Sequence, residues 1–252
     1  ELWKSDGTAS GTVMVKDIYS GSYDSLRSYS HSLIVIGNTL FFKANDGTHG
    51  YELWKSDGTA SGTVMVKDIH SEYSGDPNYL TVVGNTLYFT ASSGTSGTEL
   101  WKSDGTSSGT VPVHASNNAY SLTAVGNTLY FSASDGVNGR ELWKSDGTTS
   151  GTVMVKDINS GSSNSVPSYL TAVGNTLYFK ANDGTHGQEL WKSDGTSSGT
   201  VMVKDINSGS DSGSPYSLTA VGNSLYFGAS DGLFNGPDLY TNLGIHTEVT
   251  YS

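Results

Sequence analysis

The chain is built from an internal repeat, and its best-preserved copy, Glu141–Ile158, begins Glu-Leu-Trp-Lys-Ser-Asp-Gly-Thr. Further copies start at residues 1, 52, 99 and 189, and a divergent copy starts at Asp238. A second repeated stretch, Ser-Leu-Thr-Ala-Val-Gly-Asn-Thr-Leu-Tyr-Phe at 121–131, lies between the copies. A period of about 40 to 50 residues is typical of propeller blades and exceeds that of ankyrin or leucine-rich repeats.

Each repeat predicts four short strands, which in one copy lie at 169–173, 176–182, 189–193 and 200–206. Gly174-Asn175 is a two-residue turn between apolar runs, which predicts a tight hairpin. The other connections inside the unit are also short, so the strands form an up-and-down antiparallel sheet. No stretch shows the apolar period of a helix.

The long links between units predict how the strands are ordered. Only the connection from the fourth strand to the next first strand is long, at 19–30, 159–168 and 207–215. A chain needs such a link to return from the outer edge of one blade to the inner edge of the next. Successive side chains of a strand point to opposite faces, so Leu177 and Tyr178 of the second strand lie on different faces of the sheet. Both faces therefore carry apolar or aromatic residues, as expected for a sheet packed between two neighbouring sheets.

We therefore predict an all-β fold, a five-bladed β-propeller of four-stranded antiparallel blades in a single domain, 1–252. The first four blades lie at about 31–69, 79–114, 120–158 and 169–206. In the fifth, the N-terminal hairpin 1–18 closes the ring with the inner strands 217–229, which removes exposed sheet edges. The divergent C-terminal hairpin 238–252 is then surplus.

The alternative closure makes 217–250 a complete blade and assigns 1–18 to a truncated neighbour. It ranks lower, because a six-bladed ring that lacks one inner pair of strands leaves a hole at its axis.

Composition limits the partners. The net charge of −11 and the pI of about 4.7 exclude a basic footprint for nucleic acid or anionic membrane. There is no Cys, hence no disulfide and no thiolate metal site. No apolar run is long enough to span a membrane. The chain begins at Glu1 within a repeat, so we expect a mature product or part of a longer protein. Its acidic composition, rich in Ser, Thr, Gly, Asn and Tyr and poor in Lys, is more typical of a secreted or surface protein than of a cytosolic enzyme.

The repeated motif resembles that of the Glu-Leu-Trp-x-x-Asp-Gly-Thr family of large exported bacterial proteins, over nearly the whole chain. The resemblance implies a secreted or surface propeller and brings no established activity. The turn Ser-Asp-Gly-Thr is similar to the Asp-box hairpin of sialidase-type propellers, a folding element remote from catalysis, although the Trp position differs here. Five blades of this length are similar to tachylectin-type lectins in architecture only.

Two residue sets are predicted to be structural. The tryptophans of strand three are expected to pack between blades, each indole N–H reaching a backbone acceptor: Trp3, Trp54, Trp101, Trp143 and Trp191. Aspartates before glycine are expected to stabilise turns through nearby backbone N–H groups: Asp6, Asp57, Asp104, Asp146 and Asp194. These acidic loops lack the Asp-x-Asp-x-Asp spacing of a Ca²⁺ site, so no cofactor is expected; Ca²⁺ stays open as an alternative that the ligand spacing does not support.

The loops between the second and third strands are the candidate ligand-binding sites, because they should lie together on one rim. Their candidate ligand-binding residues are Asp46, His49, Asp135, Asp183 and His186. Each Asp–His pair is suited to hydrogen-bonding a sugar or a cation, and the competing interpretation is a solvated loop. The long loop with Arg27 and His31 also departs from the repeat.

Lysines of the fourth strand lie across the hairpin from the Glu of Glu-Leu-Trp, which predicts cross-strand ion pairs: Lys16, Lys67, Lys156 and Lys204. No nucleophile elbow, phosphate-binding loop or zinc-spaced His pair is present, so no catalytic residue is predicted.

The sequence thus predicts a non-catalytic binding module that recognises a glycan or protein through rim loops or inter-blade clefts. The alternatives are a structural or assembly unit of a larger surface protein or filament and, ranked lowest, a hydrolase.

Overall fold

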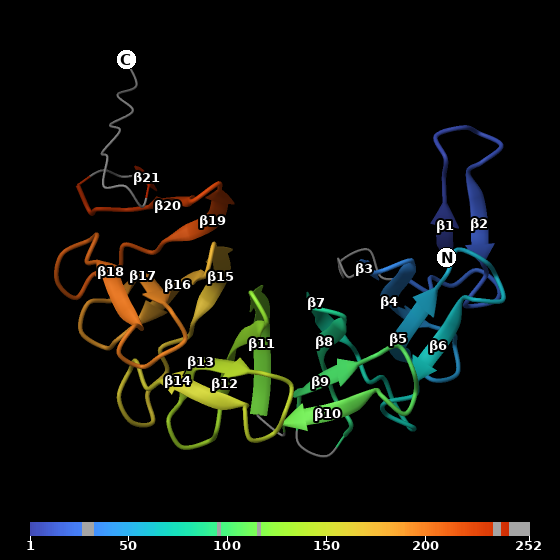
Figure 1. Cartoon of the computed structure of the whole chain (residues 1–252), viewed down its shortest axis with the longest axis horizontal. Coiled ribbons are helices and arrows are strands. Elements are labelled where there is room, and N and C mark those ends of the chain that lie inside the picture. The colour runs from blue at the N-terminus through green and yellow to red at the C-terminus, as the bar shows by residue number, and fades with distance from the viewer. Residues whose placement is uncertain (27–32, 95–96, 115–116, 234–237, 242–252) are drawn as a thin grey trace. The chain divides into compact units, whose positions relative to one another are not determined.

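The computed structural model describes residues 1–26, 33–94, 97–114, 117–233 and 238–241, all of them strands, turns and loops (Figure 1). Within those residues no helical segment has the length and apolarity that crossing a bilayer requires. The chain divides into two compact units, Glu1–Asn118 and Ala119–Ser252.

The first unit contains a two-stranded hairpin followed by two four-stranded sheets. The hairpin consists of β1 (Leu2–Lys4) and β2 (Val13–Lys16). The first sheet contains β3 (Ile34–Ile36), β4 (Thr39–Asn45), β5 (Tyr51–Ser56) and β6 (Val64–Lys67). The second contains β7 (Asn78–Val83), β8 (Thr86–Ala91), β9 (Glu99–Ser103) and β10 (Val111–His114).

The second unit contains two four-stranded sheets and one three-stranded sheet. The first begins with β11 (Asn117–Val125) and continues with β12 (Thr128–Ser134), β13 (Arg140–Ser145) and β14 (Val153–Lys156). The next contains β15 (Ser168–Val173), β16 (Thr176–Asn182), β17 (Gln188–Ser193) and β18 (Val201–Lys204). The last contains β19 (Tyr216–Val221), β20 (Ser224–Ala229) and β21 (Asp238–Thr241).

Every complete sheet is an antiparallel meander, as predicted, with its first and fourth strands at opposite edges. Tight hairpin turns hold consecutive strands side by side and antiparallel. Gly174, for example, adopts φ 57°, the left-handed conformation that a two-residue turn needs and that glycine adopts without strain. The register is the same in successive blades, with Phe42 opposite Trp54 and Phe179 opposite Trp191. The repeat in sequence is therefore a repeat in strand pairing.

Apolar side chains on both faces of each sheet form the core between neighbouring blades. In the first unit, Leu53, Val66 and Ile69 of one blade pack with Phe89 and Trp101 of the next. The equivalent cluster of the second unit joins the β11–β14 and β15–β18 sheets through Leu142, Val155, Ile158, Phe179 and Trp191. The core therefore lies between the sheets, which is the arrangement that alternating apolar residues predict.

The Asp-Gly turns fasten each blade internally, and lysines connect them to the next blade. Asp57 Oδ1 accepts hydrogen bonds from the amide and the hydroxyl of Thr59, at 2.9 and 2.7 Å. The same geometry recurs at Asp6, Asp104 and Asp194, and also at Asp146. Lys55 Nζ donates to the carbonyl of Gly105 in the neighbouring blade, at 2.8 Å. Turn and blade interface are thus tied together.

The predicted pairing of hairpin 1–18 with strands 217–229 is wrong. β20 pairs instead with β21, placing Phe227 opposite Tyr240 and Ala229 opposite Asp238. This register is that of β16 and β17, so the divergent copy serves as the third strand of its own blade. A short connection keeps β21 beside β20, whereas the N-terminal hairpin would have to close a loop of most of the chain.

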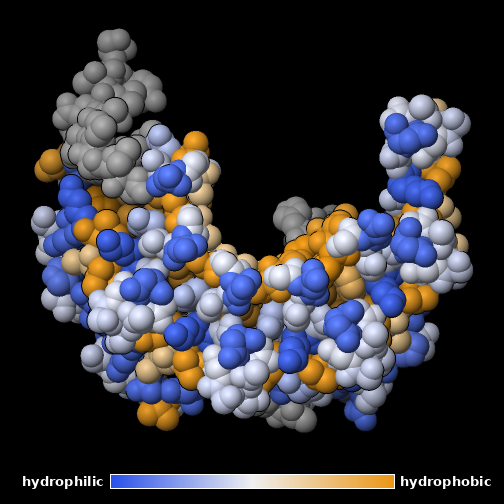
Figure 2. All heavy atoms as spheres, in the orientation of Figure 1, coloured by the Kyte–Doolittle hydropathy of each residue, from blue (hydrophilic) through white to orange (hydrophobic). Residues whose placement is uncertain are grey.

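The surface is mixed, with apolar side chains gathered over β3 and β7 of the first unit (Figure 2). Val35 of β3 is among the exposed apolar residues. The tryptophan of the β1–β2 hairpin is also uncovered. Trp3 is 58% exposed, whereas Trp54, Trp101, Trp143 and Trp191 are at most 7% exposed. Trp54 is covered by Leu2, Val15 and Ile18 of the hairpin. A tryptophan of this repeat is therefore buried by the preceding blade.

This comparison predicts unequal effects of two identical substitutions. Trp54→Ala should lower the free energy of unfolding by about 3–5 kcal/mol, because it removes a buried indole from the blade interface. Trp3→Ala should cost less than half of that, because most of its indole is already in water. Urea denaturation followed by circular dichroism measures both, and equal losses would contradict the inter-blade role.

Candidate binding site

The predicted ligand-binding loops hold their polar side chains within the loop. In the loop after β4, His49 Nδ1 lies 2.8 Å from Asp46 Oδ2, while the amides of Thr48 and His49 donate to Asp46 Oδ1. Asp183 and His186 repeat this arrangement, with 2.7 Å between the ring nitrogen and Asp183 Oδ2. The sequence pattern therefore places each pair together.

The pKa shifts within each pair favour the charged forms of both side chains. Partial burial acts to raise the pKa of Asp46, but the hydrogen bonds from His49 and Thr48 outweigh it and lower that pKa. The hydrogen bond to Asp46 raises the pKa of His49, and Asp183 has the same effect on the pKa of His186. Ordering the loop explains these contacts without a ligand, so the binding role of these residues stays a prediction.

Asp135 occupies the same position in the loop after β12, where no histidine is present. Its carboxylate accepts hydrogen bonds from the amides of Val137 and Asn138 and from the Asn138 side chain, at 2.7–2.8 Å. All five predicted residues are thus turn-forming in geometry. In the described part of the chain no three or more His, Asp or Glu side chains are grouped to hold a metal ion. Arg27 and His31 lie outside the described residues.

The glutamate of Glu-Leu-Trp has a structural role that the sequence prediction missed. Glu52, Glu141 and Glu189 are fully buried. Glu189 accepts from the amides of Ile206 and Gly213, and Glu141 accepts from Ile158 and Ser165. Each carboxylate therefore fastens the chain that leaves the fourth strand. A glutamate repeated at one position beside a buried tryptophan was the available signal.

The predicted Glu–Lys ion pairs are wrong for these three glutamates. The register places Lys67 opposite Leu53 and Lys156 opposite Leu142, one position away from the glutamate. Lys156 Nζ instead donates to the carbonyl of Thr200 in the next blade, at 2.8 Å. The lysines of the fourth strand thus join blades.

The indole N–H groups also differ from expectation. Trp101 Nε1 donates to the carboxylate of Glu99 at 3.2 Å. The Nε1 atoms of Trp54 and Trp191 have no hydrogen-bond partner within the described residues, so the expected backbone acceptor is not found there. Lysines lie over both rings instead, with Lys16 Nζ 5.8 Å from the centre of Trp54 and Lys156 Nζ 5.9 Å from that of Trp191.

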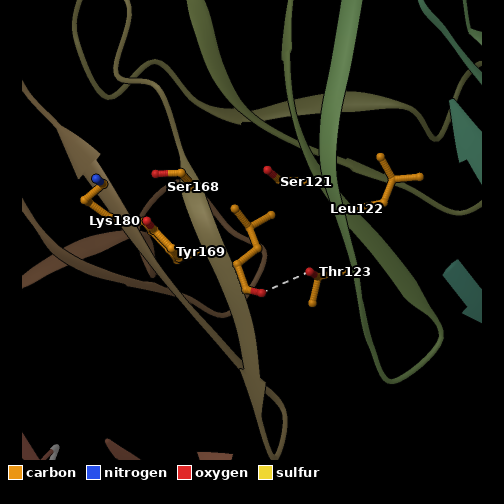
Figure 3. A pocket seen from close by; sticks show the side chains of 7 residues that line it. Ser121, Leu122, Thr123, Ser168, Tyr169 and Lys180 are labelled. Atoms are coloured by element: carbon orange, nitrogen blue, oxygen red, sulfur yellow. Dashed lines mark hydrogen bonds between the residues drawn. The ribbon is translucent and has the colours of Figure 1, made fainter. Parts of the chain in front are cut away.

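A cavity of about 600 Å³ lies between two blades of the second unit, at the first-strand edges of their sheets (Figure 3). β15 and β16 contribute Ser168, Tyr169, Leu170 and Lys180, and β11 contributes Ser121, Leu122 and Thr123 on the opposite side. Thr123 Oγ1 donates to the carbonyl of Leu170 at 3.1 Å and so joins the two walls. Hydroxyl groups, one ring and one ammonium group thus line a volume that is largely open to solvent.

The backbone turns sharply where the strands form the cavity. Ser121 and Tyr169 have φ of 55° and 54°, the left-handed region that non-glycine residues rarely adopt. In β15 the pairing register shifts between Ser168 and Thr171, which marks a bulge that turns the strand. Tyr79 and Ser217 repeat this conformation, so the bulge belongs to the fold and the cavity uses it.

The ring of Tyr169 is half exposed and lies beside Lys180. The Lys180 Nζ atom is 5.1 Å from the ring centre, within the range of a cation–π interaction. Partial burial lowers the pKa of Lys180. The sequence prediction missed this site because neither residue belongs to a motif associated with binding.

The sequence matches no protein-family model and no curated protein. Among solved structures the chain is similar to puromycin hydrolase, with a TM-score of 0.55 and 16% identity over 85% of this chain and 37% of that one. The chain is also similar to a puromycin-hydrolyzing peptidase of Mycobacterium tuberculosis, with a TM-score of 0.54 and 12% identity over 86% of this chain and 38% of that one. Its similarity to oligopeptidase B from Leishmania major has a TM-score of 0.57 and 12% identity, over 94% of this chain and 34% of that one.

These likenesses support a β-propeller-like all-β fold. At such identities they concern the fold alone. The chain spans between 34% and 38% of the length of these three proteins.

The buried glutamates predict a pH dependence of stability. Burial raises the pKa of Glu52 from 4.5 to about 7, against the opposing effect of hydrogen bonds from Ile69 and Gly75. The stability contributed by this raised pKa is fully present below pH 4.5 and is lost as the pH rises through 7, by at most about 3 kcal/mol. Glu52→Gln should therefore flatten the fall in stability over this range, although it lowers stability overall.

Urea denaturation of both proteins between pH 4 and 8 measures the difference. Glu72→Gln, at an exposed position, is the matched control and should follow the unsubstituted chain. An unchanged slope in Glu52→Gln would contradict the assignment.

Proposed function

We propose that the chain is a non-catalytic, glycan-binding module of a β-propeller that acts outside the cell or at its surface. The cavity between β11 and β15 is the observation that carries this proposal. Hydroxyl groups from two blades match the hydroxyl groups of a sugar, and the exposed ring of Tyr169 offers an apolar face to its C–H groups. A cavity of about 600 Å³ is within the usual range for small ligands.

The finer architecture is part of the proposal. The repeated inter-blade packing supports a propeller, and the resemblance to the exported Glu-Leu-Trp-x-x-Asp-Gly-Thr repeat family supports a secreted or surface location. The predicted count of five blades stays a prediction. Hairpin 1–18 was expected to fill the third and fourth strand positions of the last sheet, but β21 takes the third, and this sheet has three described strands. The peptidase names of similar structures transfer no catalytic role.

A second function, as a structural or assembly unit, is favoured by the β1–β2 hairpin. Trp3 and Met14 are 58% and 46% exposed there, and β1 pairs only with β2 among the described strands. An uncovered indole beside the free edge of a two-stranded hairpin is suited to contact with another protein.

A glycan array probed with the 252-residue chain tests the first function, followed by titration calorimetry with the sugar bound best. Tyr169→Gly should weaken that binding about tenfold, which is about 1.4 kcal/mol. It removes the ring, while glycine suits the positive φ, so the variant should fold normally.

Tyr79→Gly is the matched control, since Tyr79 has the same conformation in the first unit and does not line this cavity. Its affinity should equal that of the unsubstituted chain. If no glycan on the array binds, and if the chain self-associates in a concentration-dependent way that Trp3→Ala abolishes in sedimentation, the assembly function would be favoured over glycan binding.

A further inference from the structure

Two lysines at the same repeat position have different surroundings. Lys43 in β4 and Lys180 in β16 both follow the Leu-aromatic-Phe sequence of the second strand. The ammonium of Lys43 donates to Asp76 Oδ1 at 3.0 Å and to Asn78 Oδ1 at 2.9 Å, and its side chain is 7% exposed. The charge of Lys43 is therefore paired with the following blade.

Lys180 lacks that pairing. The blade that follows it carries Ser214 and Tyr216 where Asp76 and Asn78 stand in the first unit. Among the described residues no carboxylate lies within ion-pair distance of Lys180, and its recorded contact is with the ring of Tyr169. Partial burial of the Lys180 side chain disfavours its charged form, and an anion beside the ammonium would offset that effect.

The position of Lys180 suggests what that partner is. Among the residues that the structure describes, it is the only charged one that lines the cavity, and the serine and threonine hydroxyls share the wall with it. We propose that the cavity binds an anionic sugar, one bearing a carboxylate or a sulfate, whose charged group pairs with Lys180 while its ring lies against Tyr169. This inference rests on the proposed glycan-binding function and adds the class of sugar.

The acidic character of the chain does not exclude such a ligand. The net charge of −11 is spread over 252 residues, and charges beyond about 8 Å are largely screened at physiological ionic strength. A direct contact to the partly buried side chain of Lys180 is screened less. An anion in place would also raise the pKa of Lys180, since an opposite charge favours its protonated form.

Titration calorimetry of the full chain with three disaccharides tests the inference: digalacturonate, neutral digalactose and a sulfated digalactose. At least one acidic sugar should bind about tenfold more tightly than the neutral one. Lys180→Gln should remove that preference, and Lys180→Arg should retain most of it. Whether the carboxylate or the sulfate binds better identifies the anionic group.

Lys43→Gln is the matched control, because it removes the same charge at the same repeat position outside this cavity. It should lower the melting temperature, since it leaves Asp76 and Asn78 without their partner, and it should leave the sugar affinity within about twofold. Circular dichroism confirms that each variant folds.

Equal affinity for neutral and acidic sugars, unchanged by Lys180→Gln, would overturn the inference and leave the glycan-binding function intact. Absence of binding by all three disaccharides and across the glycan array would overturn both. Loss of the acidic preference in Lys43→Gln as well as in Lys180→Gln would also overturn it, because the effect would then reflect net charge and not this cavity.

Discussion

Packing of one blade against the next is the interaction on which the rest of the structure depends. Each sheet is only one layer thick, so its apolar residues are covered only when another sheet lies on them. Val66 and Ile69 of one blade meet Trp101 of the next, and Val155 and Ile158 meet Trp191 in the second unit. Lysine side chains that reach carbonyl groups across the same interfaces orient the neighbours. Trp3, which no preceding sheet covers in the described part of the chain, is exposed to solvent, whereas the equivalent tryptophans of the other sheets are buried.

The candidate site follows from this arrangement. Blades held face to face bring their first strands together, and the cavity lies where Ser121 and Tyr169 adopt a left-handed backbone conformation. The repeat supplies the scaffold, and under the proposed function a departure from the repeat supplies the binding chemistry. Where the first unit pairs Lys43 with Asp76, no carboxylate among the described residues pairs with the equivalent Lys180 of the second unit. The pairing of the second and third strands is nevertheless the same around both lysines.

Much of the fold could be predicted from the sequence, because the repeat period, the Gly-Asn turns and the alternation in strand two act locally. The pairing of β21 could not, because Asp238–Thr241 has lost the Trp-Lys pair by which other copies are recognised while keeping the strand register. The buried glutamates were misassigned because a carboxylate next to a lysine strand suggests an exposed ion pair, whereas a shifted register directs it to backbone amides. Lys180 was overlooked because whether its charge is paired depends on which residue the following blade places beside it.

The most direct test of the central claim is a double-mutant cycle across one blade interface. Val66→Ala, Trp101→Ala and the double variant are compared by urea denaturation, since both residues belong to one cluster contributed by two sheets. Interface packing predicts a coupling energy of about 1 kcal/mol or more, within the range for residues in contact. Additive effects, with coupling near zero, would mean that each sheet is stable by itself and would contradict the account.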